Sequence, residues 1–431
     1  MKRQTVDTTN NIISGFDTFD LRTDALASIR SQAIESFRKT GFPTTRHEEW
    51  KYTSVKEIAE KLASVGKPMA SGQLSEETIN QLLLAGKEVT LLVFENGLFN
   101  EALSSPRPNG YNIKNLATVL SDDTVKQYLG QIAVPDNESF VAINTAFVND
   151  GVFIHVPSKI VVEKPIHILY LNSDSSPAMT RNLVVAEPES SIQIFESYHS
   201  LNATTIGLTT NVTEVLVKRN ANVTWIKAQL ENDHTSQISH TQVNQEKDSR
   251  FSSTVFTTGG QLVRNNLHIR LNGTNCNSYM YGLYLLNGEQ LCDNHTLVDH
   301  ATPHCESNEL YKGVLGGKST GVFNGKIFVR QDAQKTNAYQ SNKNILLSND
   351  AQMNTKPQLE IFADDVKCSH GTTTGQLDDE ALFYLRTRGI GEQSARTLLN
   401  IAFAADVLDH IELETLRHKL QSIAEAKLMR S

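Results

Sequence analysis

Residues 214–230 read EVLVKRNANVTWIKAQL, two short runs on either side of an Asn220-Ala-Asn222 turn. Both runs are rich in β-branched and aromatic residues, which favour strands, and the polar turn leaves no room for a helix between them. Similar runs recur from about residue 140 to residue 374, among them VFIHV (152–156), IHILYL (166–171) and SIQIF (191–195). This part of the chain is therefore predicted to be built from short strands joined by turns.

A sandwich, a barrel and a parallel β-helix all fit a chain of short strands without intervening helices. The turn sequence Asp332-Ala-Gln334 is repeated as Asp350-Ala-Gln352, and this spacing of eighteen residues is interpreted as about one coil of a β-helix. The repeated turns favour the parallel β-helix among the three.

Both ends of the chain have helical patterns. Residues 20–40 place apolar side chains at helical spacing before Gly41, and residues 89–94 form a short apolar run that predicts a strand. Beyond the core, helices are predicted over about 378–388, 392–408 and 412–429. The expected organisation is a mainly helical region over residues 1–130, a β core over 131–375 and a helical region over 376–431.

Composition limits the class of protein. The 431 residues carry a net charge of −8 and give a pI of about 5.9, so no general nucleic-acid footprint is present. The first residues lack the apolar segment of a signal peptide, and no run has the length of a membrane span, which predicts a cytoplasmic protein. Four cysteines without a CxxC pair do not suggest a disulfide framework.

Two glycine-containing motifs resemble nucleotide-binding sites but have simpler interpretations. Residues 313–319 are one residue short of a phosphate-binding loop and precede a strand pattern, so a turn between strands is predicted. The run Gly389-Ile-Gly391 follows a helix and is interpreted as an interhelical turn.

A possible metal motif is also weak. His300, His304 and Cys305 are potential metal ligands, but Pro303 interrupts them, and loop histidines are the preferred interpretation. Cys276 and Cys292 are predicted to be small core residues.

The stretch IFADDVKCSHGTTTGQ (361–376) carries the strongest chemical signal. It predicts a strand that ends in a glycine-bounded turn, with Asp364, Val366, Cys368 and His370 on one face. A thiol and an imidazole on one strand face are suitable soft metal ligands, but two ligands do not complete a zinc or iron–sulfur shell. From chemistry alone, a packed cysteine and a histidine bonded to the backbone remain the alternative.

Residues 297–348 and 357–390 resemble the SufB/SufD family of iron–sulfur cluster assembly proteins, and so do the shorter segments PTTRHEEWKYT (43–53) and INTAFVNDGVFIHVP (143–157). Within this family, CSHGTTTG (368–375) with FYLR (383–386) points to the SufD branch rather than the SufB branch. The resemblance implies a right-handed parallel β-helix core flanked by N-terminal and C-terminal helical regions.

The resemblance also implies a function. It describes a non-ATPase subunit of the SUF complex, not itself an enzyme, that pairs with a SufB-type subunit and docks a SufC-type ATPase on its C-terminal helices. In that family His370 would face a cysteine of the SufB-type subunit as a transient cluster ligand, with Cys368 as the second candidate. Phe383, Tyr384, Arg386 and Arg388 are the candidate contacts to the ATPase.

The resemblance implies no stably bound cofactor, because the cluster would be transient and shared, and ATP would bind only to the SufC-type partner. One alternative within the family is a SufB-like scaffold that holds the cluster largely by itself. A polysaccharide-acting β-helix enzyme is a second alternative, although no acids and bases recur at corresponding coil positions. An exposed edge of the β-helix would also allow a homodimer when the chain is alone.

Overall fold

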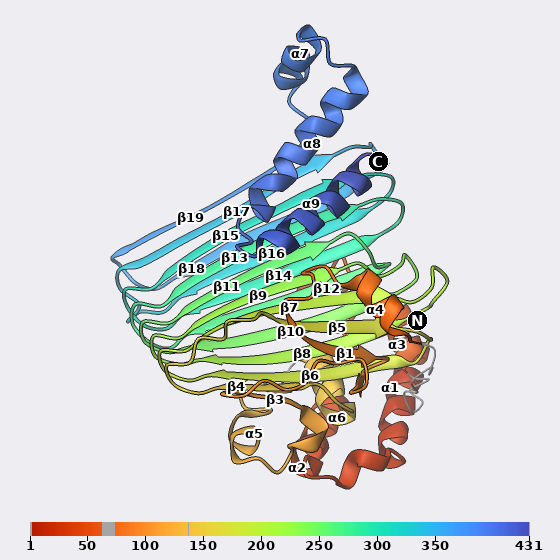
Figure 1. The fold of residues 1–431 in the computed structure, drawn as a ribbon, viewed down its shortest axis with the longest axis vertical. Helices are drawn as coiled ribbons and strands as arrows, with labels where there is room; N and C mark the ends of the chain where they lie inside the picture. The colour runs from red at the N-terminus through yellow and green to blue at the C-terminus, as the bar shows by residue number, and fades with distance from the viewer. Residues whose placement is uncertain (1, 63–73, 137, 431) are drawn as a thin grey trace.

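The computed structural model describes residues 2–62, 74–136 and 138–430, and its centre is a parallel β-helix made of two facing sheets (Figure 1). The chain alternates between the sheets, so that odd-numbered strands from β5 onward lie in one and even-numbered strands in the other. The predicted parallel β-helix with helices at both ends is confirmed.

The ten-stranded sheet contains β1 (Thr90–Glu95), β2 (Leu98–Asn100), β5 (Ile166–Asn172), β7 (Ser191–Ser200), β9 (Asn222–Gln229), β11 (Arg250–Thr257), β13 (Asn277–Leu286), β15 (Glu306–Leu315), β17 (Thr336–Leu346) and β19 (Val366–Gly375). The nine-stranded sheet contains β3 (Asn112–Asn115), β4 (Val152–Val156), β6 (Pro177–Ala186), β8 (Leu208–Val217), β10 (Ser236–Gln245), β12 (Leu262–Leu271), β14 (Leu291–His300), β16 (Thr320–Val329) and β18 (Gln352–Ile361).

One coil is longer than the repeated turns suggested. In the nine-stranded sheet Leu262 pairs with Leu291, and Leu291 pairs with Thr320, so these coils repeat every 29 residues. The interpretation of the eighteen-residue spacing as one coil is therefore wrong. The turn at residues 332–334 precedes β17, whereas the one at 350–352 follows it, so the two lie at opposite ends of one strand. A coil contains two such strands and two turns.

The main core lies between the two sheets, where side chains at the same position of successive coils stack in columns. Val184, Val215, Val243 and Ile269 form one such column across β6, β8, β10 and β12. All four are buried. Each buried apolar side chain contributes about 1.5–3 kcal/mol relative to an exposed one, so repeating the column from coil to coil stabilises the solenoid along its length.

Helices cover the outer faces of both sheets. The helices before the solenoid are α1 (Lys2–Asp17), α2 (Ala27–Thr40), α3 (Lys56–Leu62), α4 (Glu76–Leu82), α5 (Asp123–Tyr128) and α6 (Ser139–Phe147), and those after it are α7 (Asp379–Thr387), α8 (Glu392–Leu408) and α9 (Glu414–Leu428). Side chains of α2, α3 and α6 form one apolar cluster with β6, β8 and β10 of the nine-stranded sheet. On the other side α8 and α9 contact β13 of the ten-stranded sheet.

Several local predictions are confirmed. Asn96 and Gly97 have positive φ angles of 49° and 81° and join β1 to β2, and Gly389, with φ 86°, separates α7 from α8. The turn predicted over residues 313–319 is shorter than expected: residues 316–319 form a turn between β15 and β16, and residues 313–315 are the end of β15. Strands β1–β3 precede residue 130, and each is paired into one of the two sheets. The proposed domain boundaries at residues 130 and 375 stay a prediction.

Candidate functional site

The last coil leaves two edge strands at one end of the solenoid. Among the described strands, β18 pairs only with β16 and β19 only with β17. Most of β19 is exposed, in contrast to the fully buried β6 and β8 near the other end of the solenoid. An edge strand presents unpaired backbone N–H and C=O groups, which makes this end a template for a strand from another molecule.

The inward face of β19 carries Cys368 and His370. Cys368 pairs with the buried Ala338 of β17 and packs, half-buried, in the apolar cluster of the last coil together with Val366. His370 is two residues further along the same face and is exposed at the open end. Two sequence-based details are wrong. Asp364 lies in the turn before β19, and the strand continues past Gly371 to Gly375 because its ladder with β17 continues.

A column of polar side chains lies behind His370. Glu309 of β15 pairs with Gln340 of β17, which in turn pairs with His370 of β19. Gln340 Nε2 donates a 2.7 Å hydrogen bond to Glu309 Oε2, and both side chains are buried. Burial raises the pKa of Glu309 to about 7, so this carboxyl titrates near neutral pH. Spacings of 31 and 30 residues mark this column only once the coil length is known, so it could not be predicted from the sequence.

Strand β19 offers few potential metal ligands. Burial raises the pKa of the Cys368 thiol, which favours its protonated form at neutral pH. Within residues 2–62, 74–136 and 138–430, no three His, Cys, Asp or Glu side chains are grouped as metal ligands. His370 and Cys368 thus supply two donor atoms at most, where iron–sulfur clusters take four.

The second candidate surface is on the arm formed by α7 and the start of α8, which projects beyond the solenoid in Figure 1. Phe383 is 69% exposed and Tyr384 58%, whereas Leu382 is buried. Arg388 donates a 3.2 Å hydrogen bond from Nη2 to the Tyr384 hydroxyl, and Arg386 forms a 3.6 Å ion pair with Glu392. Exposed aromatic side chains beside arginines have the composition of protein-binding hot spots.

Two adjoining family models match residues 18–403 of the chain. Residues 169–403 match the family described as "SUF system FeS cluster assembly, SufBD core domain", and residues 18–168 match the "SufBD protein N-terminal region". The chain belongs to the SufBD family.

Curated relatives agree with this assignment. The chain is 33% identical to an iron–sulfur cluster assembly SufBD family protein of Synechocystis, over 93% of this chain and 91% of the relative. It is 31% identical to the iron–sulfur cluster assembly protein SufD of Escherichia coli, over 90% of both chains. Identity to the chloroplastic protein ABCI7 of Arabidopsis thaliana is 28%, over 92% of this chain and 85% of that one.

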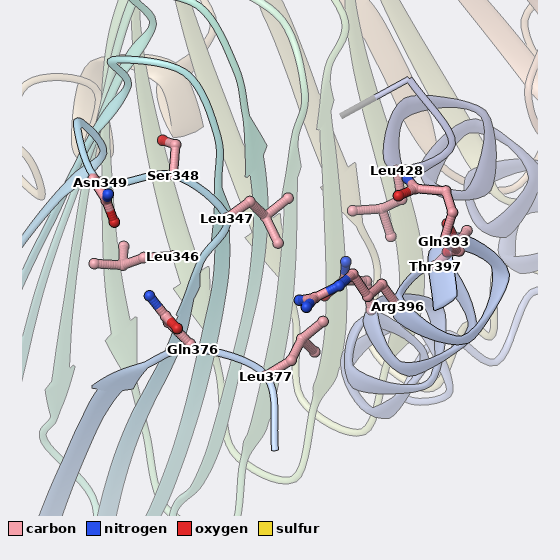
Figure 2. Close-up of a pocket in the computed structure, with 11 residues that line it drawn as sticks. Leu346, Leu347, Ser348, Asn349, Gln376, Leu377, Gln393, Arg396, Thr397 and Leu428 are labelled. Atoms are coloured by element: carbon pink, nitrogen blue, oxygen red, sulfur yellow. The ribbon is translucent and has the colours of Figure 1, made fainter. Parts of the chain in front are cut away.

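In this SufBD chain a pocket of about 300 Å³ separates the last coil from the root of the arm. Its wall includes Leu346 at the end of β17 and Leu347 just after it, Gln376 and Leu377 from the link to α7, and Arg396 from α8. Figure 2 shows the Arg396 side chain reaching into this space toward Leu377. The segment that links the solenoid to the arm therefore borders a pocket.

The SufBD motif at residues 43–53 attaches the N-terminal region to the nine-stranded sheet. Arg264 stacks 3.7 Å over the Trp50 ring and forms a 2.6 Å ion pair with Asp293. His295 lies between Asp293 and Glu49, at 2.9 and 3.2 Å. Burial is the largest single influence and lowers the pKa of His295, but the charge of Asp293 and the hydrogen bonds to Asp293 and Glu49 together outweigh it, so that pKa is raised. The residues of this motif carry the family resemblance, but their order in the sequence does not reveal these contacts.

The other predicted positions have structural roles. His300 is buried and bonds Ser307 Oγ at 3.0 Å through Nε2, while burial lowers its pKa to about 4. His304 is exposed and has a φ of 61°, and Cys276, Cys292 and Cys305 are all buried. No helix among the described residues is long and apolar enough to cross a membrane.

Proposed function

We propose that this chain is a SufD-type, non-ATPase subunit of a SUF complex that pairs with a SufB-type subunit through the open end of its solenoid. The observation that carries the proposal is the position of His370 on the inward face of β19, an edge strand with no neighbour on one side among the described strands. A partner β-helix that continues the two sheets would cover this end and bring its own side chains close to His370.

In this arrangement His370 supplies one imidazole to a transient iron–sulfur cluster, and cysteines of the SufB-type subunit supply the thiolates. Neutral imidazole is a good ligand for iron. Cys368, whose thiol is half-buried and mainly protonated at neutral pH, is the secondary candidate. The chain itself would perform no catalytic turnover and hold no permanent cofactor, and a cytoplasmic location is part of the same proposal.

The arm provides the ATPase surface of the proposal. Phe383 and Tyr384 offer exposed apolar area, and Arg386 and Arg388 offer charge beside it. A SufC-type ATPase bound there would hold ATP on its own residues. Because the pocket borders the link between β19 and α7, movement of the ATPase could change the position of the arm without breaking the packing of the solenoid.

Co-expression with the two partners tests the pairing. The wild-type chain should co-purify with both the SufB-type and the SufC-type subunit. His370→Ala should leave the complex intact and reduce iron and sulfide incorporation, whereas Ser369→Ala, on the opposite face of the same strand, should not. Normal cluster formation by the His370→Ala complex would overturn the ligand role, and a chain that reconstitutes a stable cluster alone would favour a SufB-like scaffold.

A second set of variants separates the two partner surfaces. Phe383→Ala and Tyr384→Ala should weaken binding of the SufC-type ATPase by about tenfold or more while keeping the SufB-type subunit, because buried aromatic anchors dominate such interfaces. Met429→Ala, an exposed apolar residue at the end of α9, is the matched control. Unchanged ATPase binding in both aromatic variants would place the docking surface elsewhere.

A further inference from the structure

Successive coils turn one corner of the solenoid with the same backbone conformation. Just before β11, β13, β15 and β17, a residue adopts a left-handed φ of 61–62°; these residues are Asp248, Asn275, His304 and Lys335. The residues that follow them stack in a buried column: Ser249, Cys276, Cys305 and Thr336. Two of the four cysteines are therefore neighbours in adjacent coils, although 29 positions separate them in the sequence.

The two sulfur atoms converge on the same point. Cys276 Sγ lies 2.9 Å and Cys305 Sγ 3.3 Å from the carbonyl oxygen of Gly273, so both thiols contact the same backbone atom. Adjacent strands are about 4.8 Å apart, which falls within the Cα separation of roughly 4.4–6.8 Å that a disulfide spans. The spacing of neighbouring coils is therefore compatible with a disulfide between them.

The pair has unequal thiols. The neighbouring Cys276 thiol lowers the pKa of Cys305 below its ordinary value, and the neighbouring Cys305 thiol together with burial raises the pKa of Cys276. Because the thiolate is the nucleophile, Cys305 is the thiol that reacts first and Cys276 the one that can resolve the product. Burial raises the pKa of Cys292 to about 12 and also raises that of Cys368, so neither has this activation.

The sulfurs lie just beneath the surface. Cys276 and Cys305 are 0% and 1% exposed, but the residues directly before them, Asn275 and His304, are exposed. One layer of turn residues thus separates the thiols from solvent, a barrier that a molecule as small as peroxide can cross when the turn fluctuates.

We propose that Cys276 and Cys305 form a redox-active dithiol that hydrogen peroxide oxidises to a disulfide between two coils of the solenoid. The Cys305 thiolate attacks one peroxide oxygen, the O–O bond breaks, and the departing hydroxide takes a proton to become water. The resulting sulfenic acid is then attacked by the Cys276 sulfur. The S–O bond breaks, Cys276 releases its proton, and a second water leaves. Two thiols lose two electrons in total, and one peroxide is reduced to two waters.

Peptide mapping of the folded full-length chain tests the proposal. After treatment with hydrogen peroxide, we expect a loss of two of the four free thiols and a mass decrease of two hydrogens. Digestion that cleaves between residues 276 and 305 should then yield a Cys276–Cys305 cross-linked peptide, which dithiothreitol separates. The reaction rate should reach half of its maximum below pH 8.5, the midpoint of an ordinary thiol.

Single substitutions assign the two roles. Cys276→Ser should leave a sulfenic acid on Cys305 that dimedone traps when the treated chain is unfolded in its presence, and Cys305→Ser should abolish the fast reaction. Cys292→Ser, a buried thiol outside the column, is the matched control and should still form the disulfide. Oxidation confined to Cys368 in the wild-type chain, or cross-linking only after denaturation, would overturn the proposal.

Discussion

Gln340 holds Glu309 by a 2.7 Å hydrogen bond inside the solenoid, one coil behind His370. Gly325, on the facing sheet, gives the Gln340 amide the space it occupies, since a Cβ at this glycine would lie 2.1 Å from Gln340 Nε2. The environment behind the candidate ligand therefore depends on a residue with no side chain.

Gly325→Ala should disturb this column. The added methyl group must displace the Gln340 amide and break its bond to Glu309, and such overpacking costs about 1–3 kcal/mol of unfolding free energy. Gly371→Ala is the control, because a Cβ there meets nothing within 4 Å, and we expect a change within about 0.5 kcal/mol. Urea unfolding of both variants measures the difference, and equal stabilities would contradict this view of Gly325.

A second prediction concerns how the C-terminal helices are held. Lys312 of β15 is buried, forms a 2.6 Å ion pair with Asp406 of α8, and donates a 3.1 Å hydrogen bond to the Phe403 carbonyl. Lys312→Met keeps the apolar stem and removes both interactions. Loss of these charge-assisted bonds should cost about 1.5–3 kcal/mol and increase hydrogen exchange in α8 more than in the solenoid.

Arg396→Ala provides the comparison on the same helix. Its ion pair with Glu392 is exposed, so its loss should change stability by less than about 0.5 kcal/mol. If both variants left the exchange of α8 unchanged, its attachment would depend on the apolar contacts alone.

A third prediction concerns a fully buried ion pair beneath the N-terminal region. Arg181 and Glu214 lie 2.7 Å apart with no exposed side-chain surface, and Glu214 also accepts backbone hydrogen bonds from Gly130 and Ala133. Arg181→Met leaves the Glu214 carboxylate without its cation. The expected loss is about 3–5 kcal/mol, measured by chemical denaturation.

The exposed pair between Arg219 and Glu189, at 3.1 Å, is the matched control. Arg219→Ala should cost no more than about 1 kcal/mol, because water screens this interaction. Similar losses for the two arginine variants would show that burial does not determine the cost.

The sequence predicted the β-helix, the C-terminal helices and the shared strand face of Cys368 and His370, because each depends on local periodicity or turn chemistry, but it did not show that this face points inward. It did not predict the coil length, because the repeated Asp-Ala-Gln turns occupy opposite ends of one strand. It also missed the Glu309–Gln340 column and the Cys276–Cys305 pair. Both are contacts between coils about 30 residues apart, and such neighbours become visible only when the register of the parallel strands is known.

The last prediction is a pH dependence of stability that arises from Glu231. This carboxyl is buried, accepts a 2.8 Å hydrogen bond from Asn172 Nδ2 through Oε1, and has its pKa raised by burial from 4.5 to about 8. Between these values the unfolded chain releases the proton while the folded chain keeps it. Because the unfolded state then binds fewer protons, the contribution of Glu231 to stability falls as pH rises from about 4.5 to about 8 and is constant on either side.

Glu231→Gln removes this titration while keeping the shape of the side chain. The variant should resemble the wild type near pH 4.5 and become progressively more stable than it up to about pH 8, as measured by urea unfolding across this range. Glu309→Gln provides an internal comparison, because burial raises the pKa of Glu309 only to about 7, so its advantage should stop growing near that pH. A stability difference for Glu231→Gln that does not change with pH would mean that this carboxyl is already ionised in the folded chain.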